Sequence, residues 1–284
     1  MENVKAIVAG AAGRMGKKTI KAIVETDGIE LVGALESSNH ELMGKDAGIV
    51  AGVEELGIRI DTLDTPNPEA LKTLQATDVI INFTTPEAVE AITSICIAQK
   101  KPMVIGTTAI PVDALCREIY DLSKIVPVVL APNFSIGANT IFVILPKILQ
   151  LIGATFTDFT ISEIHHTGKK DAPSGTAKKM AQIIAKEKEW NIDHDIYYSL
   201  EGKKVSDKVY VVAIRSGNTK GEHRVLIASK TEEIEIIHRV ADRQTFAEGA
   251  VRAAIFATHA VKGFYDMTDV LEFNPRHSMG CVHH

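Results

Sequence analysis

The chain contains 284 residues, of which 45% are hydrophobic and 24% are charged, a balance typical of a globular protein with a sizeable core. A net charge of −5 at pH 7, spread over interspersed acidic and basic residues, argues against nucleic acid as a partner and favours a small-molecule substrate. Since single cores stop growing near about 250 residues, we expect two domains of moderate size.

The cysteines and the N-terminus indicate a cellular compartment. Cys96, Cys116 and Cys281 are widely spaced and form no CxxC pair, so neither a disulfide framework nor a thiolate zinc site is indicated. The N-terminus passes directly into a strand-like run without the pattern of a signal peptide. No apolar stretch reaches the roughly 18 residues of a membrane span. We therefore expect a cytoplasmic protein with no membrane partner.

The first half of the chain alternates short apolar runs with helical stretches. The predicted strands are Val4–Ala9, Leu31–Leu35, Val79–Phe83, Met103–Ile105 and Val126–Leu130. Strands that are apolar throughout and alternate with helices indicate a parallel sheet covered on both faces. Residues 1–132 are thus predicted to form a doubly wound α/β domain that binds a dinucleotide.

After Asn133 the pattern changes to strands joined by short polar turns. A helix is predicted near Thr140–Ile152, followed by strands at Phe156–Ile164, Lys208–Ile214, Arg224–Ala228 and Glu233–Val240. This order predicts a mixed or antiparallel sheet in an α+β domain over residues 133–244. An alanine-rich helix at Thr245–Val261 follows, and we expect residues 245–273 to pack back on the first domain. Residues 274–284 form a tail without apolar period.

The turn after the first strand is rich in glycine. It contains Gly10, Gly13 and Gly16, and the residues between them are Ala11, Ala12, Arg14 and Met15. Small residues at the start of a helix let the backbone approach a pyrophosphate, whose charge the N-terminal N–H groups stabilise. The spacing departs from GxGxxG, so a tightly packed turn without a ligand explains the glycines equally well.

Glu36 strengthens the nucleotide interpretation. It ends the second predicted strand, twenty positions after Gly16, where a carboxylate accepts hydrogen bonds from the ribose of the adenosine. The alternative is a solvated glutamate at a strand end. Ser37 follows, where a protein dedicated to NADPH often has an arginine for the 2′-phosphate. Because Arg14 offers a cation nearby, we expect use of NADH, NADPH or both.

Two more predicted strand ends carry polar loops. These loops are Phe83–Pro86 and Gly106-Thr107-Thr108. In open α/β sheets, ligands lie beyond the carboxyl ends of the strands, so both loops are candidates for cofactor contact. A threonine before a helix also caps its N–H groups, and the two roles are compatible.

The stretch Glu163–Ala177 carries most of the candidate chemistry. It leaves a strand, crosses a polar loop and enters a helix at Pro173, where Ser174, Gly175 and Thr176 offer hydroxyl and N–H groups to a carboxylate. His165, His166 and Lys169 add protonatable donors beside this helix start. The segment therefore combines anion binding with acid catalysis.

Two other interpretations of this stretch are a zinc site and a solvated loop. Paired histidines can bind zinc, but adjacent residues of a strand point to opposite sides and no third ligand is placed nearby, so we expect no metal. The histidines and lysines can also be a solvated loop. Their concentration within twelve residues, next to a helix start, argues against that second interpretation.

This stretch resembles the signature of the 4-hydroxy-tetrahydrodipicolinate reductase family, E-x-H-H-x-x-K-x-D-A-P-S-G-T-A, and matches it at every fixed position. The similarity covers the chain to about Phe273. It includes Gly10–Gly16, Gly106–Thr108, Ala131–Ser135, Arg215–Gly217, Gly221–His223 and Arg243–Phe246. Two positions depart from the family pattern, Ala109 where many members have glycine and Ser37 where some have arginine.

The resemblance implies a Rossmann-like first domain and a hydride transfer from reduced nicotinamide to a cyclic, unsaturated dicarboxylate. It implies that His165 and Lys169 donate protons and that His166, Ser174, Gly175 and Thr176 bind the substrate. It also implies cofactor contacts by the glycine-rich turn, Glu36 and the strand-end residues, namely Gly106, Thr107, Thr108, Pro132, Asn133, Phe134 and Ser135. A homotetramer assembled through the sheets of the second domain is a further implication.

Two rival functions remain for comparison. Another two-domain dehydrogenase, of the aspartate or inositol type, shares the nucleotide-binding features but does not account for the HHxxK and DAPSGT run. A nicotinamide-binding sensor without turnover requires no proton donor beside an anion pocket. Fold-level analogy alone does not favour either alternative.

Overall fold

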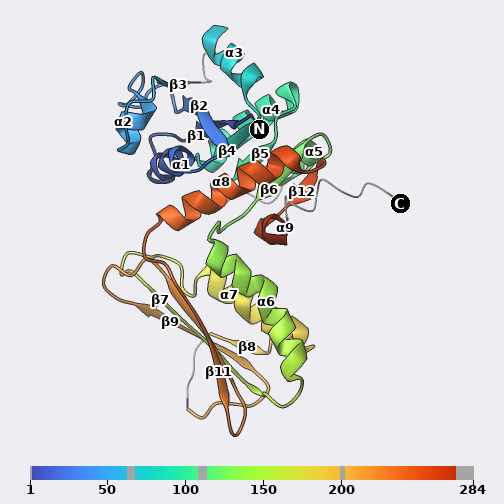
Figure 1. Cartoon of the computed structure of the whole chain (residues 1–284). Helices are drawn as coiled ribbons and strands as arrows, with labels where there is room; N and C mark the ends of the chain where they lie inside the picture. Colours follow the sequence, from blue (N-terminus) through green and yellow to red (C-terminus); the bar gives the residue numbers. More distant parts are fainter. Residues whose placement is uncertain (1, 63–67, 108–113, 199–201, 273–284) are drawn as a thin grey trace. The chain divides into compact units, whose positions relative to one another are not determined.

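The computed structural model describes residues 2–62, 68–107, 114–198 and 202–272, and the chain divides into two compact units (Figure 1). The first unit is formed by Met1–Ser135 together with Gln244–His284, and the second by Ile136–Arg243. Each unit has its own sheet and its own hydrophobic core.

The first unit is built on a seven-stranded parallel sheet. In sheet order its strands are β12 (Gly263–Tyr265), β6 (Pro127–Leu130), β5 (Met103–Ile105), β4 (Val79–Asn82), β1 (Val4–Ala9), β2 (Ile29–Leu35) and β3 (Ile60–Asp61). The chain runs outward from β1 in both directions, first through β2 and β3 and then through β4, β5 and β6. This reversal is the switch point of a doubly wound sheet, where ligands bind beyond the carboxyl ends of the strands. The predicted fold class is confirmed.

The two faces of this sheet are buried under different helices. Within β1, Ala6 and Val8 belong to one core cluster, and Ile7 and Ala9 belong to the other, as the period of two in a strand requires. The first cluster is completed by α1 (Arg14–Val24), α8 (Gln244–His259) and α9 (Met267–Glu272), with α2 (Ala47–Ala51) beside α1. The second is completed by α3 (Pro68–Ala76), α4 (Pro86–Gln99) and α5 (Ala114–Ser123).

Helix α8 returns to the first unit from the end of the second. It packs against α1 and against β4, β5 and β6, which confirms the helix predicted at Thr245–Val261. Gly249 permits the closest approach, since a Cβ there would lie 1.8 Å from the carbonyl oxygen of Phe134. The alanines of α8 thus bring the helix axis close to the sheet and to the loop that follows β6.

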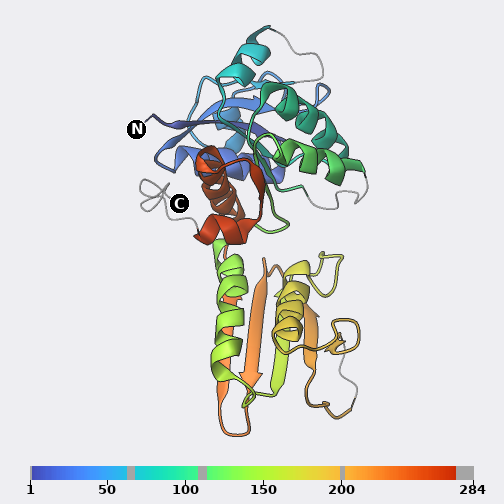
Figure 2. The same ribbon diagram turned by 90° about the vertical axis from the view of Figure 1, so that its right-hand side faces the viewer.

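The second unit contains a five-stranded mixed sheet with two helices on one face (Figure 2). In sheet order the strands are β11 (Glu233–Arg239), β10 (Glu222–Ala228), β7 (Asp158–His165), β9 (Val209–Arg215) and β8 (Ile196–Tyr197). Strands β7, β9 and β8 run parallel, whereas β10 is antiparallel to both β7 and β11. The helices α6 (Ile136–Ile152) and α7 (Gly175–Glu187) pack against each other over this sheet. The predicted mixed sheet is confirmed.

Strand β7 carries the core of the second unit on alternate residues. Phe159 and Ile161 are fully buried against Met180 and Ile184 of α7, while their neighbours along the strand are partly exposed. The strand then ends at His165, and α7 begins at Gly175. The polar segment 166–174 is therefore fixed at both ends by elements of one core.

Three short strands escape prediction from the sequence. Strands β3, β8 and β12 contain only two or three residues, too few for an apolar period to develop. Among the residues that the structure describes, no helix has both the length and the hydrophobicity needed to cross a membrane.

Candidate active site

The glycine-rich turn of the first unit is shaped by two close backbone contacts. Gly10 has a φ of +77°, and a Cβ there would lie 2.7 Å from the carbonyl oxygen of Phe83. A Cβ at Gly16 would lie 2.0 Å from the carbonyl oxygen of Gly10, so α1 packs directly on the turn. Residues with side chains at these two positions would push the helix away from the strand.

The start of α1 suits a phosphate. Its N-cap residue is Gly13, no side chain caps its first turn, and no acidic residue lies in that turn. The positive end of the helix dipole therefore faces a turn whose Ala11 and Ala12 present only small side chains. Arg14 is exposed and Met15 is half-buried at the first two helical positions. The turn fits the pyrophosphate of a dinucleotide.

Glu36 is oriented by the same turn. It follows β2, and its carboxylate accepts hydrogen bonds from the N–H groups of Ala12, at 3.1 Å, and Ser37, at 3.0 Å. Each carboxylate oxygen has a second lone pair, and the side chain is only half-buried. The carboxylate is thus held beside the glycine-rich turn with capacity to accept further donors, as a ribose would supply.

The loops after β4, β5 and β6 are joined to one another. The ring of Phe83 occupies the space that a Cβ at Gly106 would fill, and it meets the ring of Phe134 edge-on with centroids 5.9 Å apart. The hydroxyl of Thr107 donates to the carbonyl oxygen of Thr84 at 2.9 Å. These contacts connect the three loops at the carboxyl ends of the strands.

The remaining predicted cofactor residues differ in exposure. Pro132 is exposed and Asn133 is half-buried, with its amide oxygen accepting from the N–H of Ser135 at 2.8 Å. Phe134 and Ser135 are almost completely buried. Thr108 lies outside the described residues. The contacts of these residues with a cofactor stay predictions.

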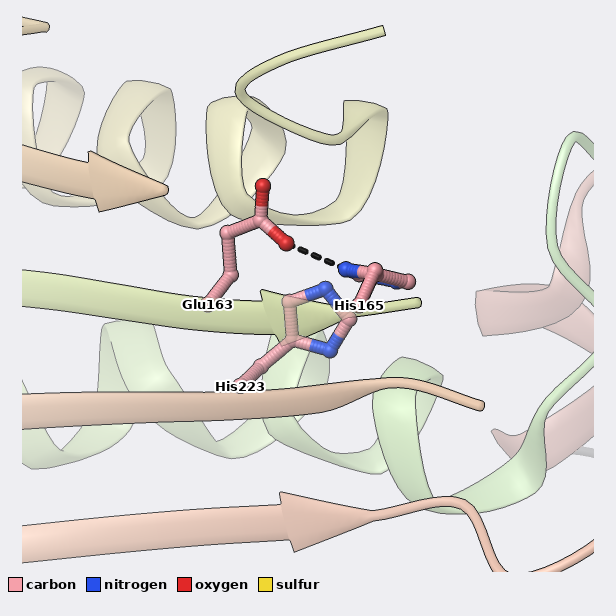
Figure 3. A group of neighbouring side chains, drawn as sticks. All are labelled: Glu163, His165 and His223. Atoms are coloured by element: carbon pink, nitrogen blue, oxygen red, sulfur yellow. Dashed lines mark hydrogen bonds and ion pairs between the residues drawn. The ribbon is translucent and has the colours of Figure 1, made fainter. Parts of the chain in front are cut away.

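In the second unit, Glu163 and His165 form the centre of the site (Figure 3). Both lie on the buried face of β7, and the Nδ1 of His165 is hydrogen-bonded to the Oε2 of Glu163. The other carboxylate oxygen, Oε1, accepts from the Nη1 of Arg215 at 2.9 Å and from the N–H of Ser174 at 3.1 Å. Glu163 is fully buried, and every contact comes from a different part of the second unit.

These contacts determine the charge of Glu163. Burial opposes ionisation, but the hydrogen bonds from His165 and Arg215, with the N–H of Ser174, outweigh it and hold the pKa of Glu163 below its usual value. The carboxyl group is therefore ionised at neutral pH, and its charge is matched by the guanidinium of Arg215.

His223 is a second buried imidazole next to this pair. Its ring lies edge-on to the ring of His165 with centroids 5.2 Å apart, and its Nε2 is 3.0 Å from the hydroxyl of Ser174. Burial, and next the positive charge of His165, lowers the pKa of His223 to about 3. His223 is thus neutral at physiological pH and helps to fix the start of α7.

The predicted substrate residues surround the start of α7. Ser174 is the N-cap, its hydroxyl accepts from the N–H of Ala177 at 3.2 Å, and it is buried. Gly175 is exposed, and a Cβ there would meet only open space. Thr176 is half-buried in the first turn. Ser174 therefore shapes the helix start, whereas Gly175 offers an accessible N–H edge.

His166 and Lys169 lie on the loop before α7. The N–H of His166 donates to the carbonyl oxygen of Thr219 at 2.8 Å, and Nη2 of Arg243 lies 3.4 Å from the ring nitrogen Nε2. Partial burial and then the charge of Arg243 lower the pKa of His166, which favours its neutral form. The ammonium group of Lys169 pairs with Asp171 at 2.8 Å.

Arg215 links this loop to the buried carboxylate. Its Nη1 contacts Glu163, while its Nη2 donates to the carbonyl oxygen of Asp171 at 2.5 Å. Burial opposes ionisation of Asp171, but the hydrogen bond from Lys169 outweighs it and lowers the pKa of Asp171. One guanidinium thus connects the segment that carries Lys169 to the strand that carries His165.

Sequence reasoning gave no role to Glu163, Arg215 or His223, although all three stand in the motifs quoted above. One signal was available for Glu163, since it occupies a position of β7 where the period of the strand calls for an apolar residue. Arg215 and His223 come from β9 and β10, and only strand pairing brings them to β7.

Glu163, His165 and His223 also satisfy the spacing of a metal site, since their potential ligand atoms lie within 4.8 Å of one another. The polar contacts of the cluster engage most of these ligand atoms, although the Nδ1 of His223 is buried without a hydrogen-bond partner in the described part of the chain. Both carboxylate oxygens accept hydrogen bonds from Arg215, Ser174 or His165, and the Nε2 of His223 contacts Ser174. A dication there would also lie next to the guanidinium of Arg215, which opposes its binding.

The first unit has the sheet, glycine-rich turn and strand-end carboxylate of a dinucleotide-binding domain, and the second presents acidic donors beside a helix start. Together these features define a two-domain, nicotinamide-dependent oxidoreductase. The family model described as "Dihydrodipicolinate reductase, N-terminus" matches residues 4–134, and the model "Dihydrodipicolinate reductase, C-terminus" matches residues 137–271. The chain belongs to the dihydrodipicolinate reductase family.

Relatives of known name agree with this membership. The chain is 40% identical over 272 residues to a 4-hydroxy-tetrahydrodipicolinate reductase of Syntrophotalea carbinolica, covering 94% of this chain and 98% of the relative. It is 39% identical over 271 residues to a protein of the same name from Geotalea daltonii, with the same two shares covered.

Solved structures share the fold. A dipicolinate-bound dihydrodipicolinate reductase from Paenisporosarcina sp. TG-14 superposes with a TM-score of 0.71 at 24% identity, over 93% of this chain and 97% of that one. A myo-inositol dehydrogenase from Corynebacterium glutamicum gives a TM-score of 0.57 at 13% identity, over 96% and 94% of the two chains. The second likeness extends the fold to dehydrogenases of other substrates.

Proposed function

We propose that this protein reduces 4-hydroxy-tetrahydrodipicolinate, through dihydrodipicolinate, to tetrahydrodipicolinate with a reduced nicotinamide, a step in diaminopimelate and lysine biosynthesis. The observation that carries the proposal is the segment between β7 and α7, where His165, Lys169 and the start of α7 are connected by one network around the buried Glu163. The names of relatives that match nearly the whole chain support the choice of substrate.

Within this proposal, the second unit supplies protons. The bound nicotinamide supplies a hydride to a carbon of the conjugated C=C–C=N system, and the electron pair displaced from that carbon must be met by a proton. His165 ends β7 with its Nδ1 held by Glu163, which leaves the Nε2 edge to donate. Lys169 adds a cationic donor on the adjoining loop. We assign proton donation to these two residues.

The substrate carries two carboxylates, which require donors of their own. Gly175 and Thr176 lie in the first turn of α7, whose dipole favours an anion. His166 and the nearby Arg243 add polar and positive groups. We assign substrate binding to His166, Gly175 and Thr176, with Ser174 holding the helix start in place.

The first unit is proposed to bind the cofactor. The uncapped start of α1 and the close-packed Gly10 and Gly16 receive the pyrophosphate, and Glu36 accepts hydrogen bonds from the adenosine ribose. A carboxylate repels a 2′-phosphate, whereas Arg14 is exposed at the same turn. We therefore propose that both NADH and NADPH are used and that NADH is preferred.

We further propose a homotetramer assembled through the open face of the second unit's sheet. Helices cover the opposite face, and Val212, Ile214 and Ile237 remain 39%, 42% and 36% exposed. The same face carries the ion pairs Arg224–Glu235 and Arg239–Glu222, so it combines exposed apolar side chains with complementary charges that are suited to pack against another sheet. Sedimentation equilibrium should return four times the 30.8 kDa mass of the chain, and a monomer at micromolar concentration would refute the assembly.

The function is tested by the loss of reduced-nicotinamide absorbance with freshly generated 4-hydroxy-tetrahydrodipicolinate. NADH and NADPH are titrated separately, and the two kcat/KM values measure cofactor preference. We expect saturable oxidation of both, and none when the substrate is replaced by an aldehyde or keto acid such as aspartate semialdehyde or oxaloacetate. Folded protein that oxidises neither cofactor with the dicarboxylate would refute the proposal.

A further inference from the structure

The position of Glu163 in β7 conflicts with the pattern of its own strand. The buried residues before it on the same face are Phe159 and Ile161, which belong to the apolar core under α6 and α7. Glu163 continues this series and is likewise fully buried. An ionised carboxylate removed from water costs several kcal/mol unless it is paired and hydrogen-bonded, so its presence here requires compensation.

Both carboxylate oxygens of Glu163 are hydrogen-bonded, and each has its own partners. Oε1 receives Arg215 at 2.9 Å and the N–H of Ser174 at 3.1 Å, and Oε2 receives the Nδ1 of His165. Arg215 and Ser174 occupy one oxygen, so the other is left for the imidazole. A carboxylate whose only role was to hold Arg215 would not need to present this second oxygen to His165.

From this geometry we infer that Glu163 is a positioning residue, which fixes the ring orientation and tautomer of His165 and stabilises its protonated form, with Arg215 as the counter-charge that keeps Glu163 ionised. The inference rests on the proposed role of His165 as a proton donor. Neither partner needs to touch the substrate for this role.

The tautomer follows from the charge of the carboxylate. An ionised carboxylate has no proton to donate, so the hydrogen between it and Nδ1 belongs to His165. The other ring nitrogen, Nε2, is then the edge that exchanges protons with a substrate. A Cβ at Gly221 would lie 3.1 Å from this nitrogen, so a glycine at that position keeps Nε2 uncrowded. The same division of roles holds in other pairs of carboxylate and histidine.

Arg215 extends the effect from His165 to Lys169. Its Nη2 donates to the carbonyl oxygen of Asp171, and the carboxylate of Asp171 pairs with Lys169. The guanidinium that balances Glu163 therefore also fixes the loop that carries the second proposed donor. We expect changes at Glu163 to act on the two donors through separate contacts, first on His165 and more weakly on Lys169.

The test is the Glu163→Gln substitution, which keeps the shape and an acceptor oxygen but removes the charge. We expect kcat to fall by about 10- to 100-fold, the usual effect of losing a supporting partner of a reactive group, with the substrate KM unchanged. A carboxylate favours the protonated imidazole, so without it the alkaline fall in kcat should move to lower pH. Parental kcat and an unmoved pH profile in folded E163Q would overturn the inference.

The matched control is Ile161→Val, which changes a buried residue on the same face of the same strand without touching a charge. It should lower the free energy of unfolding only slightly and leave kcat and its pH profile unchanged. If I161V moved the pH profile as far as E163Q does, the effect would be general loosening of β7, and the positioning role would be refuted.

A second measurement does not depend on turnover. Two-bond ¹H–¹⁵N spectra of histidine-labelled protein report which ring nitrogen carries the hydrogen. The His165 signals are assigned by their loss in His165→Gln. Neutral His165 should carry its hydrogen on Nδ1. Its titration midpoint should fall in E163Q and stay in I161V. A hydrogen on Nε2 in the parent would overturn the inference, whether or not the protein reduces the dicarboxylate. Conversely, correct spectra with an inactive parent would refute the proposed function and leave the inference about Glu163 standing.

Discussion

The glycine-rich turn of the first unit and the His165 loop of the second are built by opposite means. The turn relies on backbone groups, and its essential residues are those without side chains, such as Gly10 and Gly16. The loop relies on side chains that are held by other side chains, as His165 is by Glu163 and Glu163 is by Arg215. Added side-chain atoms should therefore damage the glycine-rich turn, whereas removal of charged side chains should damage the His165 loop.

The largest effect is expected from the proposed proton donors themselves. Lys169→Ala and His165→Ala should each lower kcat by roughly 10²- to 10⁴-fold, the range for loss of a general acid. Both leave the first unit intact, so the dissociation constant of the reduced cofactor should not change. Steady-state kinetics and cofactor fluorescence measure the two quantities on the same samples. Turnover at the parental rate in both variants would show that the loop is only a binding element.

The next effect concerns the stability of the network behind the loop. Arg215→Met leaves the buried Glu163 without its cation, and we expect the free energy of unfolding to fall by about 2–3 kcal/mol. This loss is smaller than the usual cost of breaking a buried ion pair, because His165 and Ser174 still donate hydrogen bonds to Glu163. Urea denaturation measures this change.

The control for Arg215→Met is Lys124→Met, which removes a pair with Asp121 in which both side chains are more than half exposed. Its unfolding midpoint should match the parent's, because exposed ion pairs add little to stability. Equal losses in the two variants would mean that the buried network contributes nothing beyond a surface pair.

A backbone-based site should respond to an added methyl group. Gly16→Ala places a Cβ 2.0 Å from the carbonyl oxygen of Gly10, which forces α1 away from the turn. From the ~1–3 kcal/mol that overpacking costs, we expect the dissociation constant of NADH to rise about 10- to 100-fold. Lys21→Ala, on the exposed side of the same helix, should bind NADH as the parent does. If G16A bound NADH with parental affinity, the close contact of helix and turn would have no bearing on the cofactor.

The two sites also differed in how far they could be predicted. The turn was visible in the sequence because glycines three residues apart leave a local pattern, and Glu36 follows one strand later. The loop was visible as a list of donors, but its partners Arg215 and His223 lie 52 and 60 positions beyond Glu163 along the chain. Only the register of β7 with β9 and β10 brings them together, and a register cannot be read from one strand alone.

The elements of the fold differ in the same way. Long apolar strands such as β1 and amphipathic helices such as α7 carry a period that predicts them. The edge strands β3 and β12 hold two and three residues, and they exist because a neighbouring strand offers them unpaired backbone groups. Elements of this kind depend on tertiary contacts, so sequence patterns do not reveal them.

The buried imidazole of His223 makes the second unit sensitive to acid. Its pKa is about 3 when folded, against 6.5 for an unperturbed histidine, so the unfolded chain binds the extra proton first. Stability from this residue is complete above pH 6.5 and should decline by about 1.4 kcal/mol per pH unit between pH 6.5 and 3. His223→Gln removes this dependence, so the stability of the parent should fall relative to that of the variant as the pH decreases from 6.5 to 3. Parallel curves across this range would contradict a neutral, buried His223.

The smallest effect is expected where a side chain assists the backbone-based site. Glu36→Gln loses the charge and keeps one acceptor oxygen, so only one of the hydrogen bonds from Ala12 to Oε2 and from Ser37 to Oε1 is retained. Hydrogen bonds from the ribose to a charged acceptor are the stronger kind, so the dissociation constant of NADH should rise about 5- to 10-fold. NADPH should behave differently, because the lost charge also repelled its 2′-phosphate, and its affinity should stay constant or improve. Calorimetric titration of parent and variant with each cofactor measures the dissociation constants of NADH and NADPH. Equal losses of affinity for the two cofactors would place Glu36 outside the ribose site.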